Sequence, residues 1–306
     1  MSRSWIERAR RRLAPAASAG VAIGRDYVGY AYLEGGRSAW RMRTLTEVRL
    51  DTPLFSGAPT AQLGAALARA LQESAGNLTR RYLPVHVSLP DAMVRWAMFE
   101  LDELPKSRAA QLDLVRFRFE RQGLNGAHVY ACQALARAGD KPLLLGTAAD
   151  GAWLRLVSDA LTQAGIVAWS LGANVCRQFN LFHDRLAQAS GVLVALAPDA
   201  WSLWLWDEQG FPRYARARWR TEADDHAEVA LAVERAILAY VHGAPGRTVA
   251  RVFTAAGDET GAMAGALDAR LREPCTRLSS GDFDLGADAA HGKASAALSL
   301  AAALER

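Results

Sequence analysis

The same order of strand patterns occurs twice along the chain, and this repeat constrains the fold more than any other feature. Residues 20–50 predict a hairpin of two strands and, after a Gly-Gly turn, a third strand. Residues 191–219 predict the same order around a Pro-Asp tip. A repeat of this size indicates two similar halves, each built on its own sheet.

Helices and further strands follow each hairpin. In the first half we expect helices at 59–75, 106–122 and 151–165, and strands at 84–89, 93–100, 128–136, 142–148 and 167–171. In the second half we expect helices at 225–241, 258–272 and about 287–305, and a strand at 248–254. Antiparallel hairpins joined to strand–helix crossovers predict an α/β fold with mixed sheets flanked by helices.

The predicted domains follow from the repeat. A basic N-terminal helix or tail covers 1–17, and the first half covers 18–188 with a small subdomain inserted at about 84–150. The second half covers 189–306. A chain of 306 residues is long enough for each half to bury a core of its own.

The net charge of +4 lies at the N-terminus. The first 14 residues hold five arginines and one glutamate, 5 − 1 = +4, so the rest balances at 31 − 31 = 0 and is not a basic nucleic-acid binder. Helical spacing places apolar side chains on one face of this segment and Arg8, Arg10, Arg11 and Arg12 on the other. Two interpretations stay open: a frayed tail, and a helix that attracts anionic lipid or docks on a partner.

Several classes of site are excluded or disfavoured by the sequence. No apolar stretch reaches the ~20 residues of a bilayer-spanning helix. Cys132, Cys176 and Cys275 lie far apart, which is typical of reduced thiols in a cytoplasmic protein. The histidines are scattered without ligand spacing, so we expect no metal site. A Walker A motif, a complete G-x-G-x-x-G and a G-x-S-x-G elbow are all absent from the sequence.

Three tryptophans share the predicted strand at 200–206. Strand alternation places Trp204 and Trp206 on one face and Trp201 on the other. We expect these side chains to lie in the core, because aromatic residues favour strands and bury large areas. An exposed indole row would instead mark an interaction surface.

Two halves that each open with a hairpin resemble the actin-like ATPase fold, which consists of duplicated ribonuclease-H-like halves. The block from Leu89 to Pro105 is similar to the corresponding block of the type IV pilus assembly protein PilM and of MshI, its relative in mannose-sensitive-haemagglutinin (MSHA) pili. The similarity continues through the helix at 106–122, the segment 143–149 and the Ala/Leu-rich C-terminal helix. The secretion protein GspL shares this fold but continues into a transmembrane helix, so we favour the PilM-like relatives.

The resemblance implies where a nucleotide would bind, and this sequence departs from the expected motifs. The family carries Asp-x-Gly in the first hairpin, where this chain has Ala22 at the acidic position. Ala195 stands at the matching position of the second hairpin. The remaining candidates for a degenerate nucleotide site are Gly24, Arg25, Asp26, Asp199 and Gly257. Loss of both carboxylates removes the expected metal ligands, so we expect no ATP hydrolysis and no catalytic residue.

The resemblance also implies a partner. In PilM, the subdomain containing the matching block forms, with the first subdomain, a groove for the cytoplasmic N-terminal peptide of the inner-membrane protein PilN. An extended peptide is recognised there by main-chain pairing or by side-chain pockets. The candidate groove residues in this chain are Met93, Arg95, Phe99, Leu101, Leu112 and Arg116.

These patterns together predict a cytoplasmic, non-catalytic scaffold of a type IV or MSHA-type pilus system, peripheral to the inner membrane. Its expected partner is a PilN-like peptide, with other pilus assembly proteins as further candidates, and we expect no cofactor. The alternative is a genuine ATP-binding protein whose nucleotide state controls partner binding. In that case Mg²⁺ would be held through water or through Asp26 and Asp199.

Overall fold

The computed structural model describes residues 17–36, 39–76, 83, 85–135, 141–186, 188–208, 210, 212–221, 225–243, 246–255 and 260–278. The predicted basic helix with Arg8, Arg10, Arg11 and Arg12, the predicted C-terminal helix and Gly257 lie outside these residues. Within the described ranges, none of the helices combines the length and the apolar character needed to span a membrane.

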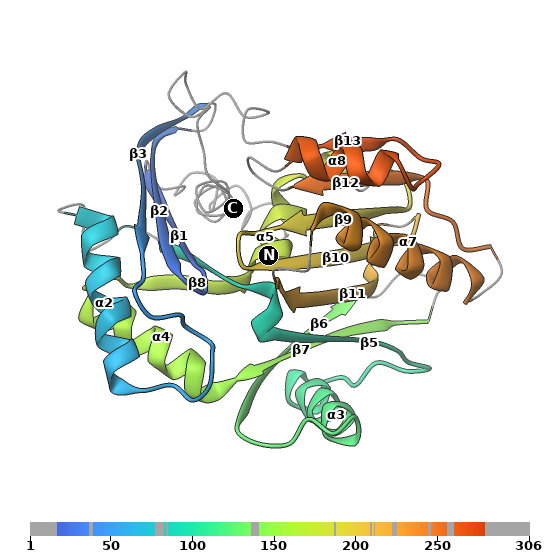
Figure 1. Ribbon diagram of the computed structural model, residues 1–306. Coiled ribbons are helices and arrows are strands. Elements are labelled where there is room, and N and C mark those ends of the chain that lie inside the picture. Colours follow the sequence, from blue (N-terminus) through green and yellow to red (C-terminus); the bar gives the residue numbers. More distant parts are fainter. Residues whose placement is uncertain are drawn as a thin grey trace.

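The first half is built on a five-stranded sheet with the order β3-β2-β1-β4-β8 (Figure 1). β1 and β2 form the predicted antiparallel hairpin, and β4 and β8 continue the sheet in parallel. One face is covered by α2 and α4, which bury leucine, valine and aromatic side chains against it. The elements are β1 (Ala17–Ile23), β2 (Tyr27–Gly36), β3 (Ala39–Arg49), α2 (Ala61–Ala75), β4 (Val85–Leu89), α4 (Gly151–Gln163) and β8 (Ala168–Ala173).

The second half repeats this connectivity in the sheet order β11-β10-β9-β12-β13. Its outer face carries α7 and α8 and buries Trp201, while the inner face buries Trp204 and Trp206. The predicted alternation and the core position of these tryptophans are therefore confirmed. The elements are β9 (Gly191–Leu196), β10 (Ala200–Trp206), β11 (Pro212–Trp219), α7 (His226–His242), β12 (Arg251–Ala255), α8 (Thr260–Asp268) and β13 (Cys275–Arg277).

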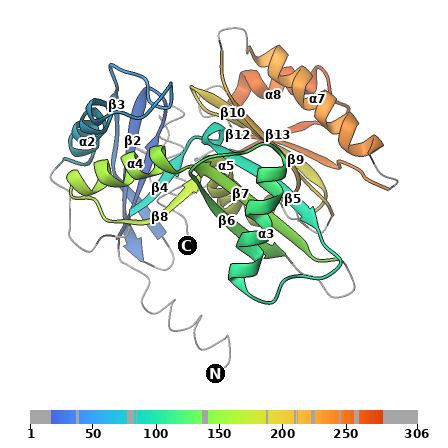
Figure 2. The same ribbon diagram turned by 90° about the horizontal axis from the view of Figure 1, so that it is seen from below.

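A three-stranded sheet in the order β5-β7-β6 forms the inserted unit, with α3 packed on one face (Figure 2). Its elements are β5 (Val94–Glu100), α3 (Arg108–Arg121), β6 (His128–Leu135) and β7 (Leu143–Asp150), whereas β4 is a strand of the first sheet. The Ser107 side chain accepts a hydrogen bond from the Ala110 N–H and so caps the start of α3. A Cβ at Gly146 would lie 2.9 Å from Val115, so glycine lets α3 pack closely on β7.

Two short helices connect the halves. α5 (Asn174–Leu181) and α6 (His183–Leu186) follow β8 directly and pack on the inner face of the second sheet. Phe179 contacts Trp204 and Trp206 with ring centroids 5.5 and 5.4 Å apart. The fold is thus the expected α/β arrangement of two duplicated halves with mixed sheets flanked by helices.

Candidate functional site

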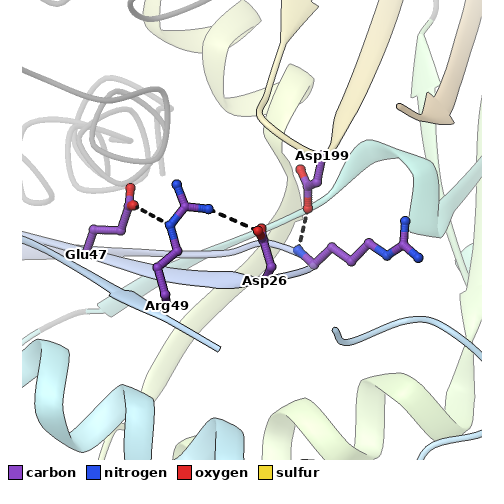
Figure 3. Close-up of polar contacts among 5 residues, drawn as sticks. Asp26, Glu47, Arg49 and Asp199 are labelled. Carbon is purple, nitrogen blue, oxygen red and sulfur yellow. Dashed lines mark hydrogen bonds and ion pairs between the residues drawn. The ribbon is translucent and has the colours of Figure 1, made fainter. Parts of the chain in front are cut away.

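The two hairpin tips meet directly. The backbone N–H of Arg25, at the β1–β2 tip, donates a hydrogen bond to the carboxylate of Asp199, at the β9–β10 tip (Figure 3). Asp26 turns away from this contact and pairs with Arg49 at 3.0 Å, and Arg49 also pairs with Glu47 at 3.1 Å. The two candidate carboxylates therefore have different roles, one between the halves and one on the surface of the first half.

The ring of Tyr27 fills the space beside this contact. Tyr27 is 1% exposed and packs against Ala22 of β1 and Ala197 of the other tip. A Cβ added at Gly24 would lie 2.0 Å from the Tyr27 ring, so glycine at this position leaves room for the ring. Burial, followed by the nearby Asp199 carboxylate, raises the pKa of Tyr27 well above its usual value. A neutral aromatic ring therefore lies between the tips.

Asp199 is itself buried, at 8% exposed. Burial raises the pKa of its carboxyl to about 6, while the N–H groups of Arg25 and of Asp199 itself oppose this rise. The atom Oδ1 has no hydrogen-bond partner among the described residues. Its other oxygen, Oδ2, accepts the Arg25 N–H and so contributes to the contact between the halves.

A second buried carboxylate, Asp91, lies where β4 ends, in the turn η2 (Asp91–Met93). Its Oδ1 accepts the N–H of Val175 at 2.8 Å and so caps the start of α5. Its Oδ2 accepts the hydroxyl of Ser202, on β10 of the second half, at 2.7 Å. Burial raises the pKa of Asp91 to about 7, although both hydrogen bonds favour the charged form and lower it.

Aromatic contacts join the halves at two further places. Phe55 stacks on Trp219 of β11 with centroids 5.8 Å apart and also meets the edge of Trp153 of α4 at 5.0 Å. Phe55 has a φ of 61°, a backbone conformation that only glycine adopts readily. Trp96 of β5 packs edge-on against Trp204 at 5.2 Å. The second half is therefore in contact with the rest of the chain at the hairpin tips and through two aromatic pairs, Phe55–Trp219 and Trp96–Trp204.

The site contains little that could hold a metal ion. In the part of the chain that the structure describes, no three His, Cys, Asp or Glu side chains cluster closely enough to act as ligands. Ala22 and Ala195 lie on β1 and β9 as the sequence places them, without a carboxylate. The arrangement holds the two halves together through the Arg25–Asp199 hydrogen bond and the packing of Tyr27.

The candidate groove residues all belong to the turn η2, to β5 and the segment just after it, or to α3. Phe99 and Leu101 are buried beneath α3, and Leu112 packs into the same core. Met93 is half-buried against the core of the first half. Arg95 and Arg116 are exposed, and Arg116 lies over the ring of Tyr130 at 5.7 Å. Among the six candidate groove residues, only Arg95 and Arg116 are exposed and therefore accessible to a partner.

Three residues at the site are not indicated by any sequence pattern. Tyr27 follows a predicted tip and looks like an ordinary strand residue, and Asp91 after Pro90 looks like a turn residue. Phe55 lies in a segment without periodicity. The one available signal is the glycine three residues before an aromatic at Gly24-Arg-Asp-Tyr27, which allows a large ring to fold back over the tip.

Comparison with known proteins places the fold. No protein-family model and no curated protein matches the sequence. Among solved structures, a protein from Bacteroides thetaiotaomicron with actin-like ATPase fold and unknown function has a TM-score of 0.55 at 11% identity, covering 87% of this chain and 92% of that chain. The ethanolamine utilization protein EutJ from Carboxydothermus hydrogenoformans has a TM-score of 0.52 at 10% identity, covering 94% and 90%. The chain therefore has the actin-like ATPase fold.

Within that fold, the likeness to one structure is stronger. A chain of the PilM-PilN type IV pilus biogenesis complex matches with a TM-score of 0.75 at 16% identity, over 94% of this chain and 97% of that chain. Both chains are thus covered almost completely. The predicted resemblance to PilM is confirmed at the level of the fold.

The buried carboxyl of Asp91 predicts a specific pH dependence. Because its pKa is about 7 in the folded protein and about 4 when unfolded, its stabilising contribution is complete below pH ~4 and is lost as the pH rises towards 7. Asp91→Asn keeps the shape and cannot ionise. We therefore expect the variant to gain stability relative to the wild type between pH 4 and 7, by up to about 1 kcal/mol per pH unit.

Urea unfolding of both proteins at several pH values measures this difference. Asp51→Asn, the same change on an exposed side chain, controls for the loss of one carboxylate. A free-energy difference between wild type and Asp91→Asn that is constant from pH 4 to 7 would contradict the assignment.

Proposed function

We propose that this protein is a non-catalytic scaffold of a type IV or MSHA-type pilus assembly system. In this role it binds the cytoplasmic N-terminal tail of a PilN-like inner-membrane protein and connects the membrane platform to the cytoplasmic assembly machinery. The observation that carries the proposal is the fold match to a chain of the PilM-PilN complex, which extends over 94% of this protein and includes an inserted subdomain.

The contact between the hairpin tips supports the absence of catalysis. In actin-like ATPases, phosphates and metal lie between the two hairpins, and here that space contains the Tyr27 ring and the Arg25–Asp199 hydrogen bond. The acidic positions are alanines, Ala22 and Ala195. The scaffold in this proposal binds no cofactor, and its two hairpin tips stay in contact through Asp199 and Tyr27.

The alternative function is ATP binding that regulates partner binding. It is favoured by one observation, the presence of Asp26 and Asp199 on the two facing tips. If the Tyr27 ring moved aside, these carboxylates could hold Mg²⁺ through water. ATP binding and partner binding are separable, so each has its own experiment.

Calorimetry with ATP and Mg²⁺ tests the nucleotide question. We expect no binding heat up to about 1 mM nucleotide, because the ligand would have to displace the buried Tyr27 ring and break the Arg25–Asp199 contact. The control is the double variant Asp26→Ala, Asp199→Ala, with circular dichroism to confirm that both proteins are folded. Micromolar binding by the wild type that disappears in the double variant would replace the scaffold with the nucleotide-regulated alternative.

Fluorescence anisotropy with a labelled peptide tests partner binding. The peptide is the cytoplasmic N-terminal segment of the PilN-like protein from the same organism. We expect saturable binding that weakens by about tenfold or more in Arg95→Glu, Arg116→Glu, because both side chains are exposed at the inserted subdomain and α3 carries a net +2 charge, 4 − 2. Arg69→Glu, on the exposed side of α2, is the matched control.

Absence of peptide binding by the wild type would remove the PilN-like partner from the proposal. Equal binding by the wild type and the double arginine variant would move the peptide away from the inserted subdomain. Neither result depends on the outcome with ATP.

Peripheral attachment to the inner membrane completes the proposal. Arg8, Arg10, Arg11 and Arg12 can each contribute about 1 kcal/mol of attraction near an anionic lipid surface. We expect the full chain to float with anionic liposomes more completely than a chain that begins at Ser18. Equal flotation of the two proteins would exclude this role for the arginine segment.

A further inference from the structure

The outer strand of the first sheet exposes large apolar side chains. Val167, Trp169 and Leu171 are 72%, 74% and 41% exposed, and they lie within five residues on and just before β8. Among the described residues, no strand pairs with the outer side of β8, which forms one border of the first sheet (Figures 1 and 2). Single exposed apolar residues are ordinary on a protein surface, whereas three on one open edge are not.

This edge also lacks the charges that normally protect a sheet border. From Ala160 to Cys176 the sequence contains no Asp, Glu, Lys, Arg or Pro, although 22% of the chain is charged. The other outer strands of the two five-stranded sheets, β3, β11 and β13, all contain arginine. The border at β8 is therefore suited to contact with another uncharged surface.

Trp169 is the middle one of the three exposed apolar residues. In the β4–β8 pairing, Val85 aligns with Ala168 and His86 with Ser170, so Trp169 has no partner on β4. A residue skipped in this way bulges from the ladder, and bulges re-aim side chains. With Val167 two residues before it and Leu171 two residues after it, the exposed apolar positions are symmetric about Trp169.

We propose that β8 is the interface of a two-fold symmetric dimer with a second copy of this chain. An antiparallel approach centred on Trp169 places the two indoles against each other and sets each Val167 opposite Leu171 of the other copy. Such an isologous contact needs one self-complementary patch, which this border supplies. Because the patch is uncharged, two identical surfaces meet without like-charge repulsion, and a central tryptophan is a frequent anchor of protein interfaces.

A dimer of this kind presents two inserted subdomains. If the proposed tail binding is correct, one dimer holds two membrane-anchored tails, and the second binding event gains from the effective concentration set by the first. The dimer itself does not rest on the proposed function, because its assembly is measured without any pilus protein.

Light scattering after size exclusion measures the mass of the full chain over a wide concentration range. We expect the mass to rise from 33.1 kDa towards twice that value as the concentration increases. Trp169→Lys should remain monomeric, because it places two charges together at the two-fold axis. Leu238→Lys changes a 49% exposed leucine on α7 to the same residue and should dimerise like the wild type.

A cysteine at the proposed axis tests the geometry independently of affinity. Trp169→Cys should form a disulfide with its own copy on mild oxidation, whereas Leu238→Cys should not. A wild-type protein that is monomeric at every concentration would overturn the proposal and leave this edge to an extended apolar peptide or a lipid surface. Dimerisation of Trp169→Lys at wild-type concentrations, or a wild-type dimer whose Trp169→Cys form does not cross-link, would overturn it as well.

Discussion

The Asp91 carboxylate is the interaction on which the relation between the two halves depends. It lies at the end of β4, caps the first turn of α5 through the Val175 N–H, and accepts the hydroxyl of Ser202 on β10. One side chain thus links the end of β4, the start of α5 and strand β10 of the second half. A buried carboxyl is costly unless its oxygens are satisfied, and here both accept hydrogen bonds. The raised pKa of this group shows that burial still outweighs those bonds.

The contact of the hairpin tips follows from this positioning. Ser202 lies three residues after Asp199 in the chain, so the segment that bonds Asp91 also brings Asp199 to the Arg25 N–H. The Tyr27 ring then fills the remaining space against Ala22 and Ala197. The small residues at Ala22, Gly24 and Ala197 acquire a common explanation. They make room for an aromatic ring between the two hairpin tips.

Much of the fold could be predicted from the sequence because it follows from local periodicity. The hairpins, the order of strands and the helices at 108–121, 151–163 and 226–242 follow apolar spacing and turn residues that act over a few positions. α5 could not be predicted in this way. It has eight residues, no side-chain N-cap of its own and a cap supplied by Asp91, 84 positions earlier in the chain. Its existence depends on a tertiary contact that no local pattern encodes.

The candidate site shows the same division. Ala22, Ala195 and Asp199 could be located from the resemblance, because hairpin positions can be matched between two halves. What these residues do could not be inferred, since Asp199 contacts Arg25 across 174 positions of sequence. Phe99 and Leu101 lie in the block that carries the resemblance, yet they pack beneath α3. A sequence block shared with a family locates a region of the fold, while the burial of each side chain determines which of them can contact a partner.

The closed contact between the halves has a thermodynamic consequence for any ligand that would enter there. A ligand shifts a conformational equilibrium only by the difference between its affinities for the two states. To separate the tips, its binding free energy would have to offset three losses together: the exposure of Tyr27, the Arg25–Asp199 hydrogen bond, and the aromatic contacts of Phe55 and Trp96. Binding on the exposed surface of the inserted subdomain breaks none of these contacts and so carries none of this cost. The contacts thus oppose a ligand that enters between the tips and do not oppose one that binds on the exposed surface of the inserted subdomain.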